Sequence, residues 1–155
     1  MTKPDCLHVG ITDLPPLRVS HKLCIFRADP GNPDRAIRKA FQALREWVVG
    51  FGLDPDILLH VGIPTLDKQD LTTYDCCVEF PLPIDEEAVD VQQKSLSGGT
   101  YAVLRIEKTP RKIAKSIREF QGDYMPEHGI IVDESRPVYE IYYKDTMEYC
   151  VTIIV

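Results

Sequence analysis

The stretch NPDRAIRKAFQALREWVVGFG, residues 32–52, decides the fold predicted for this chain. It has the pattern of an amphipathic helix, which Asn32 is suited to cap and Pro33 to open. Its apolar residues recur every three or four positions, at Ile37, Phe41, Leu44, Val48 and Phe51. Gly50 and Gly52 then offer a place for the helix to stop.

A second stretch repeats this construction 77 residues further on, counting from Pro33 to Pro110. Thr109 is expected to cap it, and Pro126 is expected to follow its end. Its apolar positions are Ile113, Ile117, Phe120 and Tyr124. The pattern therefore predicts two helices of the same design.

Runs rich in β-branched and aromatic residues surround both predicted helices and indicate strands. The clear runs are residues 19–27, 57–63, 74–80, 99–106, 137–143 and 149–155, and two weaker ones lie near 7–11 and 88–94. The order strand, helix, strand, strand thus occurs twice. Residues 81–87 are proline-rich and acidic, and they separate two halves of about 1–83 and 84–155.

A length of 155 residues suits a single domain, residues 1–155. Short connections between strands predict an antiparallel sheet, with the two amphipathic helices packed on one face. The predicted class is therefore α+β, a duplicated strand–helix–strand–strand module. We expect a ligand groove at its pseudo-two-fold seam, because pockets tend to form at such interfaces.

The charge of the chain restricts its partners. The net charge of −6 repels phosphate, so we expect no direct contact with nucleic acid. The basic residues of the helices, which include Arg111, Lys115 and Arg118, are interpreted as solvated faces. No apolar run is long enough to span a membrane, and the first ten residues do not resemble a secretory signal. We therefore expect a cytoplasmic protein without a membrane partner.

The cysteines give no sign of a metal site. There are five of them, an odd number, which favours free thiols in a reducing compartment. Cys76 and Cys77 are adjacent, so on a strand they point to opposite faces and cannot bind one ion together. The sequence also has no phosphate loop and no nucleophile motif. We expect neither a metal nor another cofactor.

Glu140 is the most informative polar residue, since it lies in the middle of the strand-like run 137–143. Alternation places it on one face with Val138 and Tyr142. Two interpretations stay open at this point. Glu140 lies either on a solvated face or in a pocket, where a cationic ligand ringed by aromatic residues would remove the cost of burying a carboxylate.

Several stretches resemble the GyrI-like small-molecule-binding domains, which also form the effector-binding halves of some AraC-type and MerR-type regulators. The matching stretches are residues 97–102, the helix from Pro110, residues 137–142, the last strand 149–155, Leu44-x-x-Trp47-Val48 and residues 75–78. The resemblance implies a duplicated strand–helix–strand–strand fold. It also implies that Glu140 faces the ligand groove, with Tyr142 beside it and Tyr101 as a further pocket residue. Ile117 departs from the family pattern, in which a tryptophan is frequent.

Four other residues are candidates for contact with a ligand. His60 lies in an otherwise apolar strand, where a satisfied core histidine is the more frequent explanation. Trp47 lies beside the first helical stripe and can both pack in the core and stack on a cation. Phe120 and Tyr124 of the second helix have the same two explanations, and a buried Tyr124 hydroxyl would need a partner.

Three functions are compatible with these residues. The first is a stand-alone effector- or drug-binding protein for a small, apolar, cationic aromatic molecule anchored by Glu140. The second is a hydrolase of reactive electrophiles of the cyclopropane type, with Glu140 as general base and Tyr101 or Tyr142 as acid. The third is a protein-interaction module resembling gyrase inhibitors, with gyrase or a separate regulator as partner.

Overall fold

The computed structural model describes residues 7–26, 33–67, 70–82 and 91–154. These residues form two compact units. Unit 1 contains residues 7–14 and 99–154, and unit 2 contains the described residues between Pro15 and Gly98. Within each unit every strand pairs antiparallel with its neighbours, and helices accompany the strands. The predicted α+β class with antiparallel strands and two main helices is confirmed.

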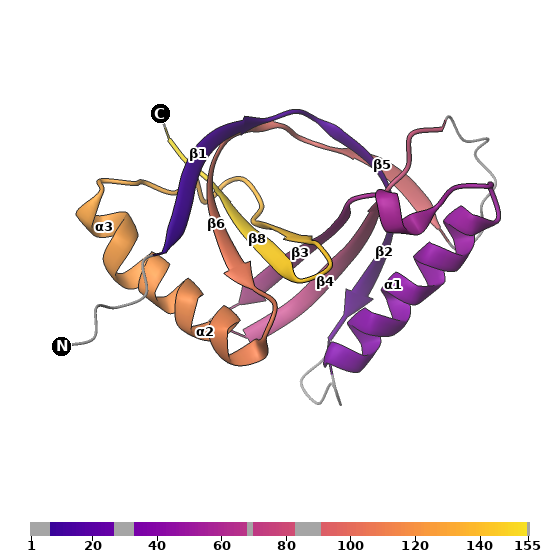
Figure 1. Ribbon diagram of the computed structural model, residues 1–155, viewed down its shortest axis with the longest axis horizontal. Helices are drawn as coiled ribbons and strands as arrows, with labels where there is room; N and C mark the ends of the chain where they lie inside the picture. Colours follow the sequence, from indigo (N-terminus) through magenta and orange to yellow (C-terminus); the bar gives the residue numbers. More distant parts are fainter. Residues whose placement is uncertain (1–6, 27–32, 68–69, 83–90, 155) are drawn as a thin grey trace. The chain divides into compact units, whose positions relative to one another are not determined.

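Unit 2 has four strands in the order β3-β4-β2-β5, with one long helix beside them (Figure 1). Its elements are β2 (Leu17–Ile25), α1 (Pro33–Val49), a 3₁₀ turn (Pro55–Ile57), β3 (His60–Asp67), β4 (Asp70–Glu79) and β5 (Gln92–Leu96). The first helix is confirmed, although its predicted cap, Asn32, lies outside the described residues. Strand β3 begins at His60 rather than at residue 57, because the Asp54 side chain accepts a hydrogen bond from the Asp56 amide and stabilises the 3₁₀ turn.

The end of α1 depends on a glycine. Gly52 has a φ of 78°, a backbone conformation that residues with a Cβ atom rarely adopt. This turn lets the amides of Gly52 and Leu53 donate to the carbonyls of Val49 and Val48, at 2.9 and 3.3 Å. The paired hydrogen bonds satisfy carbonyls that the helix end would otherwise leave without donors.

The core of unit 2 lies between α1 and the strands. Leu44 and Val48 are fully buried there with Cys76 and Val78, in a cluster that does not include Cys77. Alternation along β4 therefore places Cys76 on the helix-covered face and Cys77 on the opposite face, as predicted. Cys24, Cys76, Cys77 and Cys150 are free thiols in the described chain.

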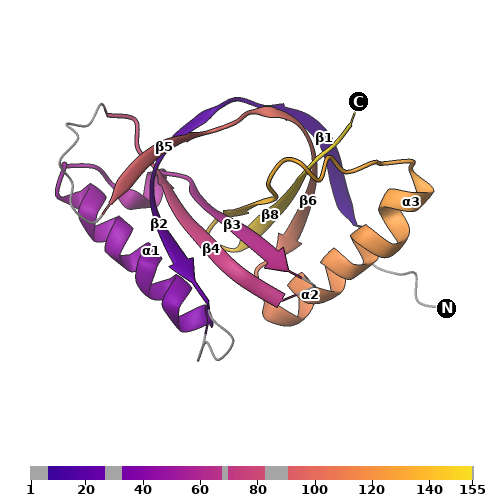
Figure 2. The same cartoon turned by 180° about the vertical axis from the view of Figure 1, so that it is seen from behind.

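Unit 1 has the strand order β1-β6-β8-β7, and Figure 2 shows its helical segment from behind. Its elements are β1 (His8–Leu14), β6 (Gly99–Glu107), α2 (Pro110–Glu119), a π-helical turn (Phe120–Tyr124), α3 (Met125–Glu127), β7 (Tyr139–Tyr142) and β8 (Thr146–Thr152). Phe120 is fully buried against Leu104 and Met147. The other residues of the second predicted apolar stripe, Ile113, Ile117 and Tyr124, are partly buried and pack against this core.

The second helix does not end before Pro126, contrary to the prediction. The chain continues from α2 through the π-helical turn into α3, where Pro126 is the second residue. Proline is tolerated in the first turn of a helix, where the amide it lacks has no required acceptor. Thr109 precedes α2 as predicted, but its side chain makes no capping hydrogen bond.

The repeat is longer than the predicted strand–helix–strand–strand order. The weak run near 7–11 is the seven-residue strand β1, and the run near 88–94 contributes to β5, although residues 88–90 lie outside the described part. Each helix is therefore preceded by two strands. Strand β1 pairs with β6 and β5 pairs with β2, so the compact units do not follow the boundary at residues 83 and 84. The groove predicted at the seam stays a prediction.

Candidate ligand-binding site

Glu140 lies on the helix-covered face of β7. Tyr139 and Ile141 are buried on one face of this strand, at 5% and 8% exposure, and Glu140 and Tyr142 are half-buried on the other. Tyr142 packs with Val138 against the cluster beneath α2, so this second face is the one that the helix covers. The solvated-face interpretation is therefore not what unit 1 shows.

Two tyrosines accompany the Glu140 carboxylate. The Tyr142 hydroxyl donates to Glu140 Oε1 at 3.2 Å. Tyr149 lies directly opposite Glu140 on β8. Burial and the nearby negative charge of Glu140 both raise the pKa of Tyr149, so its hydroxyl keeps its proton at neutral pH. The result is a half-buried negative charge beside two phenol rings.

The π-helical turn supplies a further polar group to this face. Gln121 Nε2 donates to the Tyr149 hydroxyl at 2.9 Å. Turns of this kind occur frequently at functional sites, because the extra residue re-aims side chains. Neither Gln121 nor Tyr149 was predicted from the sequence. Alternation along β7 predicts the face of Glu140 but not these two residues. Tyr149 lies opposite Glu140 because of the register between β7 and β8, and Gln121 is placed by the π-helical turn.

The two aromatic candidates of the second helix lie next to this group. Phe120 meets the Tyr149 ring edge-on, with centroids 6.3 Å apart, and is fully buried. Tyr124 is half-buried and stacks on His128 at 3.9 Å. Phe120 is therefore a wall of the core behind Tyr149, while Tyr124 keeps part of its ring accessible.

Tyr101 is not brought together with Glu140. It is fully buried and stacks on Tyr139 at 5.4 Å, on the face of unit 1 opposite to Glu140. The Arg136 guanidinium lies over the Tyr101 ring at 5.6 Å. Burial, and then the hydrogen bond with Tyr139, raise the pKa of Tyr101 to about 12. These contacts form a packed aromatic stack, and the contact of Tyr101 with a ligand stays a prediction.

His60 occupies the start of β3 in unit 2. Its Nδ1 lies 2.9 Å from the Leu58 carbonyl, and its Nε2 lies 3.0 Å from Arg45 Nη1. Because a carbonyl can only accept, Nδ1 carries a proton and Nε2 accepts from Arg45, which fixes the neutral tautomer. Arg45 is in turn ion-paired with Asp56 at 2.6 Å, and Phe41 lies beside the imidazole at 6.0 Å. The sequence pattern favours a solvated position for the basic residues of the helices, Arg45 among them. In the structure Arg45 instead donates a hydrogen bond to the candidate residue His60.

Trp47 belongs to a different aromatic group of unit 2. Its ring lies 4.7 Å from Phe51 and 4.9 Å from Phe80. His60 contacts Phe41 and Arg45, whose side chains project from a different side of α1 than Trp47 does. The described contacts therefore do not join Trp47 to His60. Trp47 is half-buried, and its described contacts are those of a residue that packs against the core.

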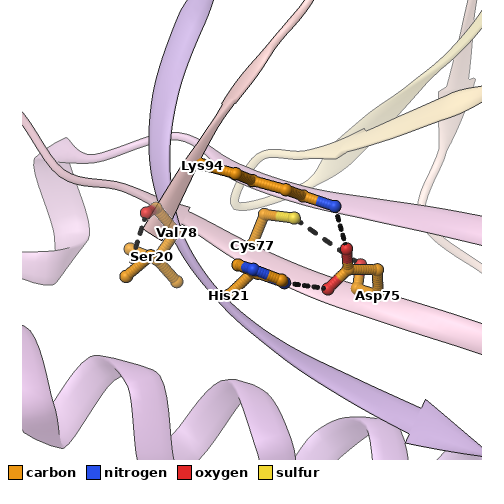
Figure 3. A network of polar contacts seen from close by, with 6 residues as sticks. All are labelled: Ser20, His21, Asp75, Cys77, Val78 and Lys94. Atoms are coloured by element: carbon orange, nitrogen blue, oxygen red, sulfur yellow. Dashed lines mark hydrogen bonds and ion pairs between the residues drawn. The ribbon is translucent and has the colours of Figure 1, made fainter. Parts of the chain in front are cut away.

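A polar network that the sequence did not reveal lies on the face of unit 2 opposite α1 (Figure 3). Asp75 is 7% exposed, accepts from His21 Nδ1 at 2.9 Å and is ion-paired with Lys94. Burial acts to raise the pKa of Asp75, but the hydrogen bonds and charges of His21 and Lys94 outweigh it, and the net pKa is lowered. Burial also raises the pKa of the neighbouring Cys77 thiol to about 12. This network joins three strands and contains no activated nucleophile.

Among the residues that the structure describes, no group of three or more His, Cys, Asp or Glu side chains is placed to hold a metal ion. The described helices likewise include none that is both long and apolar enough to cross a membrane.

Comparison with known proteins identifies relatives of this fold. A family model described as GyrI-like small molecule binding domain matches residues 10–153. No curated protein matches the sequence. Among solved structures, that of SAV2435 bound to tetraphenylphosphonium is 15% identical, with a TM-score of 0.58, and the match covers 95% of this chain and 94% of that one.

Two further structures are similar. The C-terminal domain of EcmrR is 7% identical, with a TM-score of 0.67 and coverage of 96% and 98%. A hydrolase from Listeria innocua is 13% identical, with a TM-score of 0.65 and coverage of 94% and 91%. At these identities the likeness shows the fold.

Proposed function

Because the chain belongs to the GyrI-like small molecule binding domain family, we propose that it binds a small, apolar, cationic aromatic molecule against Glu140. The observation that carries this proposal is the hydrogen bond from Tyr142 to Glu140 on the helix-covered face of β7. It holds a carboxylate in a half-buried position beside aromatic rings. Such a position suits a ligand that brings positive charge and apolar surface together.

The physical reasons are specific to this arrangement. Water compensates a partly buried carboxylate less well than an exposed one, so a cation placed against it gains more than at the surface. Tyr142, which is half-buried, offers a ring face worth about 0.5–2 kcal/mol to a cation. SAV2435, which has a similar fold, was solved with tetraphenylphosphonium, a lipophilic cation with aromatic rings. That structure supports the ligand class without identifying the ligand of this chain.

Titration calorimetry with tetraphenylphosphonium tests the anchor. Glu140→Gln keeps the shape of the side chain and removes its charge, and we expect the affinity to fall at least about tenfold, equivalent to about 1.4 kcal/mol. Glu127→Gln is the matched control, because Glu127 is exposed on α3 of the same unit. If Glu140→Gln binds as tightly as the wild type, Glu140 is not the anchor.

A hydrolase is the second candidate. The observation in its favour is that Tyr142 and Glu140 form a hydrogen-bonded acid and base pair, and a Listeria hydrolase shares the fold. In this version Glu140 removes a proton from water and Tyr142 protonates the leaving group, while Tyr101 plays no part. Incubation with a cyclopropane-type electrophile distinguishes the two functions. Multiple turnovers that Glu140→Gln abolishes support the hydrolase, and stoichiometric binding supports the effector-binding protein.

A further inference from the structure

A groove of about 1080 Å³ lies in unit 1 between α2 and the paired strands β1 and β6. It is separate from the Glu140 group, since β8 lies between β6 and β7 in this unit. The residues that line it are Leu7, His8, Arg105, Ile106, Glu107, Arg111, Lys112, Lys115, Ser116, Arg118 and Glu119. None of them takes part in the proposed ligand site.

The groove is basic although the chain is acidic. Its lining contains five lysine and arginine residues against two glutamates, whereas the whole chain has a net charge of −6. Lys112 is ion-paired with Glu107, and Lys115 lies 3.9 Å from Glu119. Arg111 and Arg118 are exposed and form no ion pair with any carboxylate that the structure describes. Positive charge concentrated in this way favours an anionic partner.

From this placement we infer that the groove binds an extended acidic segment of a partner protein. Arg111, Lys115 and Arg118 follow one another at intervals of four and three residues along α2, about 6 and 4.5 Å along the axis. Carboxylates two residues apart on an extended segment are about 6.8 Å apart, which suits Arg111 and Lys115. Arginine also binds carboxylates with two parallel hydrogen bonds.

The lining favours a peptide over a nucleic acid. Leu7, which is half-buried, gives the groove an apolar contact, and protein interfaces combine such contacts with a charged rim. A nucleic acid would also extend beyond the groove over a protein of net charge −6, whereas a short acidic segment ends within it.

Fluorescence anisotropy with a short labelled peptide, in which glutamate alternates with threonine, tests this inference. We expect binding at about 0.05 M salt that weakens at about 0.15 M, because exposed charges are screened over shorter distances there. The double variant Arg111→Glu, Arg118→Glu should bind at least about tenfold more weakly. The same peptide with glutamine in place of glutamate should not bind.

The matched control is Arg38→Glu, Lys39→Glu on α1. These exposed residues line a smaller basic hollow of about 680 Å³, and the control changes the net charge by the same amount. We expect it to bind the acidic peptide within about twofold of the wild type, with circular dichroism confirming that both double variants are folded. The inference is overturned by absence of peptide binding, by equal losses in the two variants, or by tighter binding of a DNA oligonucleotide of equal charge.

Discussion

The phenol ring of Tyr74 on β4 lies directly over Gly62 on the paired strand β3, in the space that a side chain at position 62 would fill. Tyr74 is 4% exposed and cannot move away without opening the core beneath α1. A Cβ atom at position 62 would overlap its hydroxyl. We predict that Gly62→Ala lowers the free energy of unfolding by about 2 kcal/mol, the usual cost of overpacking, in urea denaturation.

Gly10 provides the control for this substitution. It also lies in a strand, β1, but a Cβ atom there would have no heavy atom within 4 Å. Gly10→Ala should leave the free energy of unfolding close to that of the wild type. Equal effects of the two alanines would show that the Tyr74 contact is not the reason for the glycine.

Asp75 should contribute stability at neutral pH that disappears in acid. Burial acts to raise its pKa in the folded protein, but the hydrogen bonds and charges of His21 and Lys94 outweigh burial and hold the pKa below that of a free aspartate. Because the folded state favours the charged carboxylate, the contribution of Asp75 to the free energy of unfolding is complete above the pKa of the unfolded chain. It is lost as the pH falls through the lower pKa of the folded protein. Asp75→Asn should cost about 2 kcal/mol at pH 7 in urea denaturation.

The pH dependence separates this effect from simple misfolding. The difference in unfolding free energy between wild type and Asp75→Asn should begin to shrink as the pH falls below about 4, where the unfolded chain takes up the proton. It should be lost once the pH is below the lowered pKa of Asp75 in the folded protein. Asp56→Asn is the comparison, because Asp56 is exposed although it is paired with Arg45. That variant should unfold close to the wild type at every pH. A constant difference for Asp75→Asn would exclude a role for its charge.

The helices were predictable from the sequence because their signals are local. Pro33 and Pro110 stand at the first helical positions, and the apolar stripes match the faces of α1 and α2 that pack against the two cores. The end of the second helix was not predictable. The π-helical turn at Phe120–Tyr124 carries the helical path beyond Glu119 into α3, where Pro126 is the second residue.

The candidate site was predictable only in part. The face on which a strand residue lies follows from alternation along the strand, whereas its neighbours on other strands depend on the register of strand pairing. Alternation within β7 correctly separated Glu140 and Tyr142 from Tyr139. It does not show that Tyr101 aligns with Thr152 and Tyr139 with Cys150, which places both tyrosines on the other face. Asp75 was missed for the same reason, since its partners come from two other strands.

The buried cysteines should be unreactive in the folded protein. Burial raises the pKa of Cys77 and Cys150 to about 12, and it raises that of Cys76 as well. Only the thiolate is nucleophilic, so these residues should resist iodoacetamide at pH 8. Peptide mapping by mass spectrometry should detect their alkylation only after denaturation. Alkylation of Cys77 in the native protein at the rate of a free thiol would show that its strand opens readily.

Two tyrosine substitutions should separate ligand binding from stability. Tyr142→Leu keeps apolar volume but removes the ring and hydroxyl beside Glu140, so we predict about fivefold weaker binding of tetraphenylphosphonium, equivalent to about 1 kcal/mol. Tyr101→Phe removes a buried hydroxyl that interacts with Tyr139 and Thr152. It should lower the free energy of unfolding by about 1 kcal/mol and leave the affinity unchanged. Calorimetry and urea denaturation of both variants measure the four values, and a loss of affinity in Tyr101→Phe equal to that in Tyr142→Leu would contradict the assignment of the ligand to the Glu140 face.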